Sequence, residues 1–412
     1  MYRFTTASWL AIDSIRAHKL RSFLTLLGVI IGVASVVLVG AAIDGLGLYA
    51  EQSTAKAFGT DSYLIGQLLQ LGRLTRKERM DRLRYNKPIR MDDVEYLKIT
   101  TGKDILYSPY RTKGDDVKHD NLTYETANII GVAAALPDIR DVTLVDGRFF
   151  TEAEEQTRQP VAVIGQDIVS TLFPSTSPIG KTIRIKGIDF TVLGVQEKLG
   201  SANGRSQDNG VYIPTPVYTK LYGTEKSVVV FGKPRPETGF TLETGLDESR
   251  TALRTRFKAK PGKPDNFDFL TPDAIRSFVD SILGLIGAVV IPVTGISLVV
   301  GGIVIMNIML VSVTERTREI GVRKSLGARS SDIMLQFLLE ALIMSMMGGL
   351  IGLTIGGLAA AGLGKALDTP LRLTLPYVIL SIFVSTAVGV LSGWYPARRA
   401  ARLDPVEALR SE

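Results

Sequence analysis

Residues 282–313 read ILGLIGAVVIPVTGISLVVGGIVIMNIMLVSV, an uninterrupted apolar run of 32 residues. A helix of about 20 apolar residues already crosses the hydrocarbon core of a membrane. The excess length indicates either a tilted helix or a first part that stands out of the membrane as a stalk. Pro292 lies inside the run and is expected to kink or break the helix locally. The run therefore predicts a stalk and membrane helix over residues 281–313.

Three further apolar runs are long enough to cross a membrane, at residues 23–43, 332–363 and 375–395. A cleaved signal peptide is the alternative for residues 23–43, with Val39-Gly40-Ala41 resembling a cleavage site. Its apolar core exceeds the usual 7–15 residues of a signal peptide and follows a long amphipathic stretch, which favours an uncleaved helix. The fold class predicted here is membrane α-helical, with four transmembrane helices.

The composition indicates a chain divided into strongly apolar segments and an ordinary globular part. Apolar residues make up 45% and charged residues 22% of the chain, and the mean hydropathy is +0.19. The absence of cysteine excludes disulfides and thiolate metal sites. The net charge of +7 fits nucleic acid or an anionic membrane surface, and the second is favoured because the basic residues cluster beside the apolar runs. The lipid bilayer, and no nucleic acid, is the partner predicted from charge.

The basic residues also predict the orientation of the four helices, since cytoplasmic loops are enriched in Lys and Arg. Three clusters fall on one side of a four-pass topology. Both termini are therefore predicted to be cytoplasmic. The cytoplasmic segments are residues 1–22 (an amphipathic helix along the interface), residues 314–331 and the tail 396–412. Residues 44–280 and the loop 364–374 are predicted to be extracytoplasmic. The clusters are Arg3, Arg16, Lys19 and Arg21; Arg316, Arg318, Arg323, Lys324 and Arg329; and Arg398, Arg399, Arg402 and Arg410.

Small residues recur at the spacing that close helix packing in lipid requires. Gly28 and Gly32 are four residues apart in the first run, and Gly348, Gly352 and Gly356 share one face of the third. For the third run we expect packing within the chain. For the first run we favour a homodimer contact, with intrachain packing as the alternative.

The predicted extracytoplasmic region is α+β. Short alternating or apolar segments, punctuated by Gly and Pro, predict a β-rich insert over about 104–213. Strand and helix signals on both flanks of the insert predict a mixed unit. Residues 70–88 are strongly basic, which is typical of a solvated helix face or loop and also fits a surface for anionic lipid or a partner.

The chain carries few residue patterns that could perform chemistry. The stretch nearest to a phosphate-binding loop, AAAGLGKA at 359–366, lacks the first Gly and ends in Ala. The two histidines, His18 and His119, are predicted on opposite sides of the membrane. No catalytic, cofactor-binding or metal site is therefore predicted. Glu340 lies inside the third run, close to its cytoplasmic end, and an interfacial pair with a loop arginine is expected.

Residues 313–329 alternate in charge, and Ile320, Val322 and Leu326 supply an apolar side. The pattern predicts a short helix that ends at Gly327, with Ser330 or Ser331 capping the next helix. Because it joins two membrane helices, such a helix would act as a lever for a cytoplasmic partner.

Several stretches resemble a known family. Residues 297–340, SLVVGGIVIMNIMLVSVTERTREIGVRKSLGARSSDIMLQFLLE, resemble the FtsX-like permease domain of MacB-type ABC transporters, as do 393–410, GWYPARRAARLDPVEALR, and 20–37, LRSFLTLLGVIIGVASVV. VDGRFFTEAEE (145–155), VAVIGQDIVSTLF (161–173) and IGKTIRI (179–185) are similar to the MacB-like periplasmic core domain. The resemblance covers nearly the whole chain.

The resemblance implies a homodimer in the bacterial inner membrane, whose extracytoplasmic part has a mixed porter region and an inserted sabre region. It implies mechanotransmission, in which ATP hydrolysis in the cytoplasm moves the outer domains. MacB itself carries a fused N-terminal ATPase, whereas this sequence starts at the permease, so ATP is expected on a separate ABC ATPase chain. This chain would then be no enzyme and hold no cofactor. The coupling helix that docks on the ATPase would comprise Glu315, Arg316, Thr317, Arg318, Glu319, Ile320, Gly321 and Arg323.

The leading hypothesis is therefore a permease subunit for efflux or secretion, with an extracytoplasmic adaptor and an outer-membrane channel as further partners. The alternatives are a non-transporting transducer that regulates an extracytoplasmic enzyme, and a subunit for lipoprotein extraction. A membrane-anchored enzyme is a fourth reading that lacks candidate residues.

Overall fold

The computed structural model describes residues 19–59, 61–202, 205–367, 371 and 373–410. The chain divides into two compact units. The first, here called the bundle, comprises residues 1–49 and 279–412, and the second, here called the core domain, comprises residues 50–278. Each unit is described by itself.

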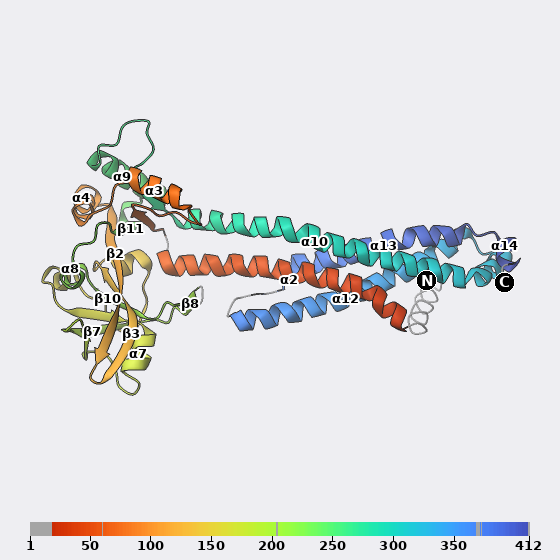
Figure 1. The fold of residues 1–412 in the computed structure, drawn as a ribbon, viewed down its shortest axis with the longest axis horizontal. Coiled ribbons are helices and arrows are strands. Elements are labelled where there is room, and N and C mark those ends of the chain that lie inside the picture. Colours follow the sequence, from red (N-terminus) through yellow and green to blue (C-terminus); the bar gives the residue numbers. More distant parts are fainter. Residues whose placement is uncertain (1–18, 60, 203–204, 368–370, 372, 411–412) are drawn as a thin grey trace. The chain divides into compact units, whose positions relative to one another are not determined.

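Six helices of the described residues belong wholly or mainly to the bundle (Figure 1). Four of them, α2, α10, α12 and α13, are long and apolar enough to cross a membrane, which confirms the four predicted spans. Residues 1–18 of the predicted N-terminal amphipathic helix lie outside the described residues, and residues 19–22 are part of α2. The bundle helices are α2 (Lys19–Phe58), α10 (Pro272–Glu315), α11 (Thr317–Ser325), α12 (Ser330–Leu367), α13 (Leu375–Ala401) and α14 (Pro405–Arg410).

The helices extend beyond the apolar runs that predicted them. α2 continues fifteen residues past 43, to Phe58, and α10 begins at Pro272 and passes through Pro292 without a break. The helices are longer than the predicted spans because polar residues end an apolar run without ending a helix. α2 stops where Gly59 adopts a φ of +78°, and a Cβ there would lie 2.5 Å from the carbonyl oxygen of Ile139. Both constraints require glycine.

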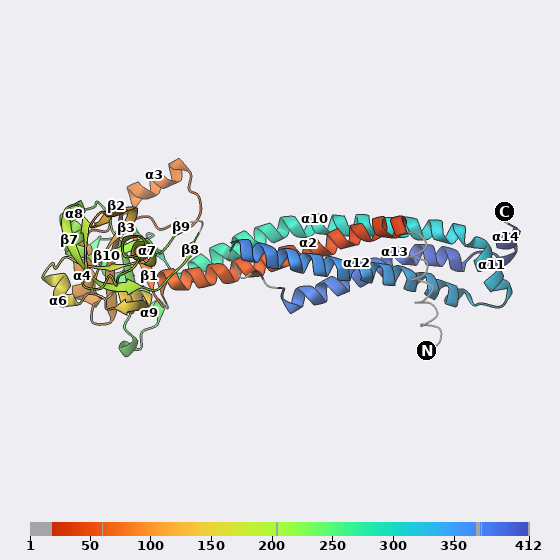
Figure 2. The same ribbon diagram turned by 90° about the horizontal axis from the view of Figure 1, so that it is seen from below.

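Figure 2 shows the four long helices running side by side. Their contacts form a ring in the order α2, α10, α13 and α12, and glycine lies at the contact of each neighbouring pair. A Cβ added at Gly28 of α2 would lie 2.6 Å from the Cα of Gly301 on α10. A Cβ added at Gly302 of α10 would lie 2.7 Å from the Oγ of Ser392 on α13. Without side chains at these points, the helix backbones approach closely enough for dispersion contacts to hold them together in lipid.

The third helix of the ring completes the contacts. Gly352 and Gly356 of α12 face α2, where an added Cβ would lie 2.7 Å from the Ile30 carbonyl oxygen and 2.9 Å from that of Ala34. α12 also contacts α13, since the hydroxyl of Ser385 donates to the carbonyl of Ser345 at 2.7 Å. Gly348 likewise contacts Val29 on α2.

The homodimer contact considered for Gly28 and Gly32 does not fit this arrangement. Gly28 faces Gly301, and an added Cβ at Gly32 would lie 2.7 Å from a methyl carbon of Leu298. Both glycines are covered by α10 of the same chain, so a second copy has no access to them. The sequence could not choose between the partners because a small-residue face fits any close helix.

The core domain combines helices and strands that follow the predicted α+β pattern. Its helices are α3 (Arg76–Tyr85), α4 (Met91–Thr101), α5 (Leu136–Arg140), α6 (Glu152–Gln156), α7 (Gln166–Leu172), α8 (Thr215–Tyr222), the 3₁₀ turn η1 (Pro236–Thr238) and α9 (Leu242–Arg256). Its strands are β1 (Tyr63–Gly66), β2 (Ile105–His119), β3 (Leu122–Val132), β4 (Leu144–Gly147), β5 (Val161–Ile164), β6 (Thr182–Ile185), β7 (Ile188–Gln196), β8 (Ser201–Ala202), β9 (Arg205–Ser206), β10 (Gly210–Pro214), β11 (Val229–Pro234) and β12 (Asp268–Leu270).

One sheet of ten strands runs through the domain in the order β12-β1-β11-β2-β3-β10-β5-β7-β4. The tenth strand, β6, pairs along β7 and meets β2 where Lys118 lies opposite Arg184. Strands β2, β3, β10, β5, β7 and β6 therefore close into a ring. Alternate side chains of these strands form a buried cluster that includes Ile129, Ile164 and Phe190, as expected of a small closed barrel.

The long strand β2 belongs to two parts of the sheet. Its residues 105–110 pair with β11, and residues 111–119 pair with β3. The insert predicted at about 104–213 therefore begins later, at Arg111. It also extends past 213, because Tyr218 of α8 packs in the barrel cluster. The sequence could not place these two limits, because a strand that passes from one part of the sheet into the other leaves no break in the sequence pattern.

The flanking part of the domain packs α4 and α9 over β1, β11 and the first half of β2. A chain of buried hydroxyls lies in this core. Ser249 of α9 bridges the hydroxyls of Tyr63 and Tyr107, with 2.6 Å to each. Thr101 continues the chain at 2.7 Å from the hydroxyl of Tyr107. Burial raises the pKa of both tyrosines above the ordinary value, so these groups stay neutral and act as hydrogen-bond links.

Candidate functional site

The short helix predicted within residues 313–329 is present as α11, between α10 and α12. Glu315 is the last residue of α10, and Arg316 interrupts the helix with φ of −104° and ψ of 16°. The other predicted docking residues, from Thr317 to Arg323, lie on α11 itself. Gly327, which follows the helix, has a φ of +95°, and this left-handed turn allows α12 to start at Ser330.

Two arginines attach this segment to α12. Arg316 lies 3.7 Å from the carboxylate of Glu340, whose side chain is only 6% exposed. Arg323 donates to the amide oxygen of Gln336 at 2.7 Å and also pairs with Glu319, one turn back on α11. The predicted pair between Glu340 and a loop arginine is confirmed. A buried carboxylate of this kind is costly unless it is paired, so the contact constrains the angle between α11 and α12.

A lysine attaches α11 to the other side of the bundle. The ammonium of Lys324 donates to the carbonyls of Ala401 and Leu403, at 2.7 Å each. These carbonyls lie at and just beyond the end of α13, where helix carbonyls lack internal partners and carry partial negative charge. The next helix, α14, packs against α11. Asp404 starts it by accepting from the backbone amide of Val406 at 2.8 Å.

The two faces of α11 have different environments. Ile320 and Gly321 are buried, and Ile320 packs in the bundle core with Val313 and Ile333. The opposite face exposes Arg318, Glu319, Val322 and Leu326. Ile320, Val322 and Leu326 therefore do not form the single apolar side that the sequence suggested. Residues two apart on a helix are separated by about 200°, so Ile320 and Val322 must diverge.

The structure thus divides the eight predicted docking residues. Arg318 and Glu319 are exposed, whereas Ile320 and Gly321 are buried, and Arg316 and Arg323 are bonded to α12. Leu326, 83% exposed, was not among the predicted docking residues. An apolar side chain directly before a helix-ending glycine was the sequence signal that could have identified it.

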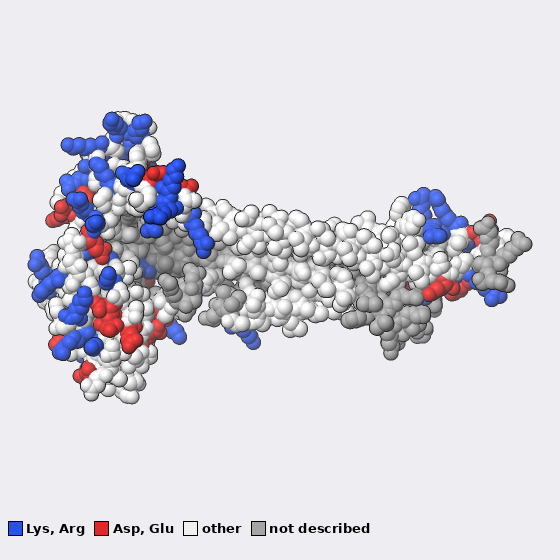
Figure 3. All heavy atoms as spheres, in the orientation of Figure 1, with Lys and Arg blue, Asp and Glu red and all other residues white. Residues whose placement is uncertain are grey.

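Charge is distributed unevenly over the bundle. Figure 3 shows that charged side chains on the visible face gather at the end that carries α11 and α14, and are nearly absent along the middle of the long helices. The contact between α11 and α14 brings the basic clusters at 316–329 and 398–402 to the same end of the bundle. This arrangement is the one that the positive-inside rule requires of two segments on one side of a membrane.

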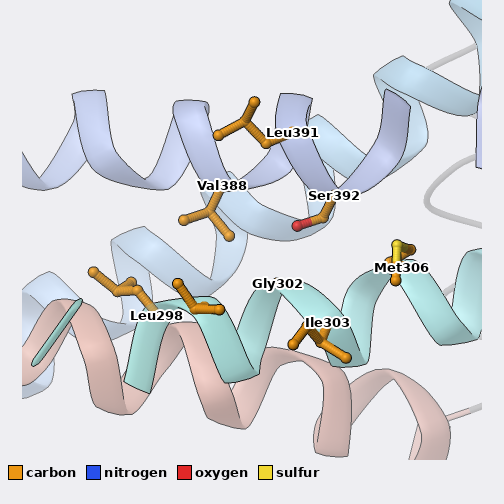
Figure 4. A pocket seen from close by; sticks show the side chains of 8 residues that line it. Leu298, Gly302, Ile303, Met306, Val388, Leu391 and Ser392 are labelled. Atoms are coloured by element: carbon orange, nitrogen blue, oxygen red, sulfur yellow. The ribbon is translucent and has the colours of Figure 1, made fainter. Parts of the chain in front are cut away.

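A groove of about 260 Å³ lies between α10 and α13 (Figure 4). It is lined by Leu298, Val299, Gly302, Ile303, Met306, Val388, Leu391 and Ser392. Its only side-chain polar group is the hydroxyl of Ser392, whereas a specific ligand site needs several convergent polar groups. The groove therefore resembles an ordinary lipid-facing surface between two helices.

In the part of the chain that the structure describes, no three His, Cys, Asp or Glu side chains come together as metal ligands would.

Comparison with known proteins places these features in a family. Residues 22–259 match the model of the MacB-like periplasmic core domain, which is more than half of the chain. The chain belongs to the MacB-like family. Residues 291–405 match the FtsX-like permease C-terminal model, so the MacB-like core domain and the permease helices are parts of one multi-pass membrane protein.

Two relatives are both named macrolide export ATP-binding/permease protein MacB. The protein of Bdellovibrio bacteriovorus is 37% identical over 97% of this chain and 61% of its own length. That of Neisseria gonorrhoeae is 34% identical over 100% of this chain and 61% of its own length. The chain therefore spans about three fifths of the length of these curated relatives. The MacB-like permease region is what they share with it.

Among solved structures, the periplasmic region of MacB from Actinobacillus actinomycetemcomitans covers 55% of this chain and 95% of its own, at 17% identity and a TM-score of 0.43.

Proposed function

We propose that this chain is the permease of a MacB-like ABC transporter, and that it transmits movement from a cytoplasmic ATPase to the core domain for efflux or secretion. The termini, α11 and α14 would face the cytoplasm, and the core domain would be extracytoplasmic. Two copies would assemble through surfaces other than the Gly28 face, and ATP would be bound by an ABC ATPase on the cytoplasmic side.

One observation carries the proposal. α11 is held on one side by Arg316 and Arg323 against α12, and on the other by Lys324 against the end of α13. A helix bonded to both neighbours cannot yield on its own, so a push on its outer face would move the membrane helices with it. α10 continues for 44 residues, about 66 Å at the rise of an α-helix, and so extends well past the hydrocarbon core.

The outer face of α11 has the composition of a docking surface. It offers the exposed cation of Arg318, followed at four-residue spacing by two exposed apolar side chains, Val322 and Leu326. Arginine and large apolar residues at the centre of an interface commonly contribute most of its binding energy. The relatives' name includes an ATP-binding part, which supports an ATPase as the partner of this face.

The test is the double substitution Arg318→Ala with Leu326→Ala in the full chain, co-expressed with its ATPase. Truncating two central interface residues at about 1–2 kcal/mol each weakens binding at least about 30-fold. ATP-driven function should fall in proportion, while membrane insertion stays normal. Leu122→Ala with Lys113→Ala, both exposed in the core domain, is the matched control. Full coupling in the α11 variant would show that the ATPase docks elsewhere.

The orientation is tested separately by protease protection in sealed membrane vesicles. Residues 60–270 should be cleaved from the side opposite to Arg318, and cleavage from the same side would overturn the proposal. The extracytoplasmic partner distinguishes efflux from enzyme regulation. Capture of an adaptor protein supports efflux, whereas capture of a wall hydrolase supports a regulatory transducer.

A further inference from the structure

The core domain contains a recess of about 300 Å³ between α3, α9 and β12. Two arginines, two aspartates and several apolar side chains line it. Sites for small molecules begin at about this volume and combine apolar walls with a few convergent polar groups. The recess has both properties, and all of its lining belongs to the core domain. The lining includes Leu69, Arg82, Arg250, Asp265, Asp268 and Phe269.

Hydrogen bonds between the walls fix the shape of the recess. Asp268 of β12 accepts from the side-chain amide of Asn86, just after α3, at 3.0 Å, and from the backbone amide of Leu69 at 3.1 Å. The hydroxyl of Tyr85, the last residue of α3, donates to the carbonyl of Pro264 at 2.8 Å. These contacts hold α3 against the segment that leads into β12. Both carboxylate oxygens of Asp268 therefore already have donors within the protein.

The second carboxylate of the lining is also satisfied from within the chain. Arg254 of α9 donates to the Oδ1 atom of Asp265, and the Nε atom of Arg250 lies 3.1 Å from its Oδ2 atom. A carboxylate whose two oxygens both face guanidinium groups has little capacity left for a cation or a further donor. The two aspartates therefore argue against a cationic ligand.

The two arginines of the lining, in contrast, retain hydrogen-bond donors. Arg82 approaches Asp268 only to 3.7 Å, which is too long for a hydrogen bond. Arg250 directs Nη1 to Asp247 at 2.6 Å and Nε to Asp265, which leaves Nη2 without a partner among the described residues. Both arginine side chains are accessible to solvent, with exposed fractions of 48% and 39%. The unused hydrogen-bonding capacity of the recess therefore consists of cationic donors.

We propose that this recess binds a small organic carboxylate with an apolar or aromatic body. A carboxylate supplies the acceptors that the guanidinium groups lack, and its planar geometry matches their paired donors. Leu69 and Phe269 offer apolar surface beside these groups, and the guanidinium of Arg250 lies 5.3 Å from the centre of the Phe269 ring. The acidic side chain of a partner protein would supply the carboxylate but no apolar body for these walls.

The charge of the surrounding surface would assist binding. Residues 70–88, which include α3, carry seven basic against two acidic residues. A surface with charge of one sign raises the local concentration of ions of the opposite sign. The basic segment would therefore gather organic anions, and the recess would select among them. Binding at this site depends on the core domain alone, independently of the ATPase.

The test is fluorine NMR of a ligand in the presence of the full chain in phosphatidylcholine nanodiscs, with empty nanodiscs as the blank. The ligand is 4-fluorobenzoate, which is ionised at neutral pH. We expect the protein to broaden its signal, and excess unlabelled benzoate to restore the sharp signal. The neutral isostere 4-fluorobenzamide should bind roughly tenfold more weakly, because hydrogen bonds to charged groups are the stronger ones. The α-amide of N-acetylglutamic acid mimics an acidic protein side chain and should displace 4-fluorobenzoate less well than benzoate does.

Substitutions then assign the binding to the recess. Arg82→Gln and Arg250→Gln should each weaken the binding of 4-fluorobenzoate roughly tenfold, because each removes a charged donor. Arg84→Gln is the matched control, since it removes the same charge from the same helix at an exposed position. Arg84 lies about 200° around the helix from Arg82 and outside the recess, so its replacement should change the affinity by less than about twofold.

Four outcomes would overturn the proposal. If benzoate does not reverse the broadening, or no broadening occurs, the recess binds no carboxylate. Equal binding of 4-fluorobenzamide means that the site does not recognise charge. Equal effects of Arg82→Gln and Arg84→Gln mean that diffuse surface charge attracts the ligand. Displacement by the glutamic acid derivative as effective as that by benzoate assigns the arginines to an acidic side chain of a partner protein.

Discussion

Replacing Gly28 by alanine should loosen the bundle by a predictable amount. The added Cβ would lie 2.6 Å from the Cα of Gly301, whereas ordinary van der Waals contacts of Cβ atoms are 3.4–4 Å. The neighbour is backbone, so the strain cannot be relieved by a side-chain rotation, and α2 and α10 must separate by about 0.8 Å. Overpacking of this kind costs about 1–3 kcal/mol.

The helix propensity of alanine acts in the opposite direction, by up to about 1 kcal/mol. A control is therefore needed that carries the propensity gain without the clash. Gly284 supplies it, because it also lies on α10 and a Cβ there meets nothing within 4 Å. Gly284→Ala should be neutral or stabilising, and Gly28→Ala should be less stable than Gly284→Ala by the overpacking cost.

The assay is thermal unfolding of the purified full chain in mild detergent, followed by the size-exclusion peak of the folded protein. Gly301→Ala should reproduce the loss, since its Cβ would lie 2.8 Å from the carbonyl carbon of Gly28. Equal stability of the Gly28→Ala and Gly284→Ala proteins would refute the close approach of the two helices.

Three further predictions concern other contacts. Ser249→Ala removes the bridge between two buried tyrosine hydroxyls and should cost about 1–3 kcal/mol in urea unfolding; a cost near zero would show that the bridge is not formed. Hydrogen bonds from Arg148 lower the pKa of Glu154 from 4.5 to about 2, so the carboxylate stabilises α6 above about pH 5 and this support is lost as the pH falls towards 2. Solvent screening limits the effect to about 1 kcal/mol or less; hydrogen exchange of residues 151–156 should show it, and Glu154→Gln should remove this pH dependence. Lys324→Met should accelerate trypsin cleavage near the end of α13, because two carbonyls lose their donor; an unchanged rate would contradict the role of this lysine.

The sequence predicted best what depends on long, uniform patterns. The four apolar runs appear as helices, and the alternation from Ile105 to Pro214 appears as strands. The pairing of Glu340 was predictable as well, because a buried acid near a basic loop has few alternatives. Each of these predictions rests on a strong energetic constraint, either burial of apolar surface or neutralisation of charge.

Local details escaped prediction where several solutions cost about the same. The partner of Gly28 could not be chosen because glycine fits against any helix. The short helices α5 to α8 lie among strands and span at most eight residues, too few for a helical period to stand out. On α11, the outward direction of Leu326 depends on where Arg316 breaks the helix, which the charge pattern does not reveal.

The shared strand β2 has a consequence for protein engineering. A deletion of residues 104–213 would remove residues 105–110, and with them the hydrogen-bonding edge on which β11 rests. The remaining half would then expose an unpaired strand, a well-known route to aggregation. Chimeras should instead be cut between Tyr110 and Arg111, and again after α8, so that each fragment keeps a complete set of backbone partners.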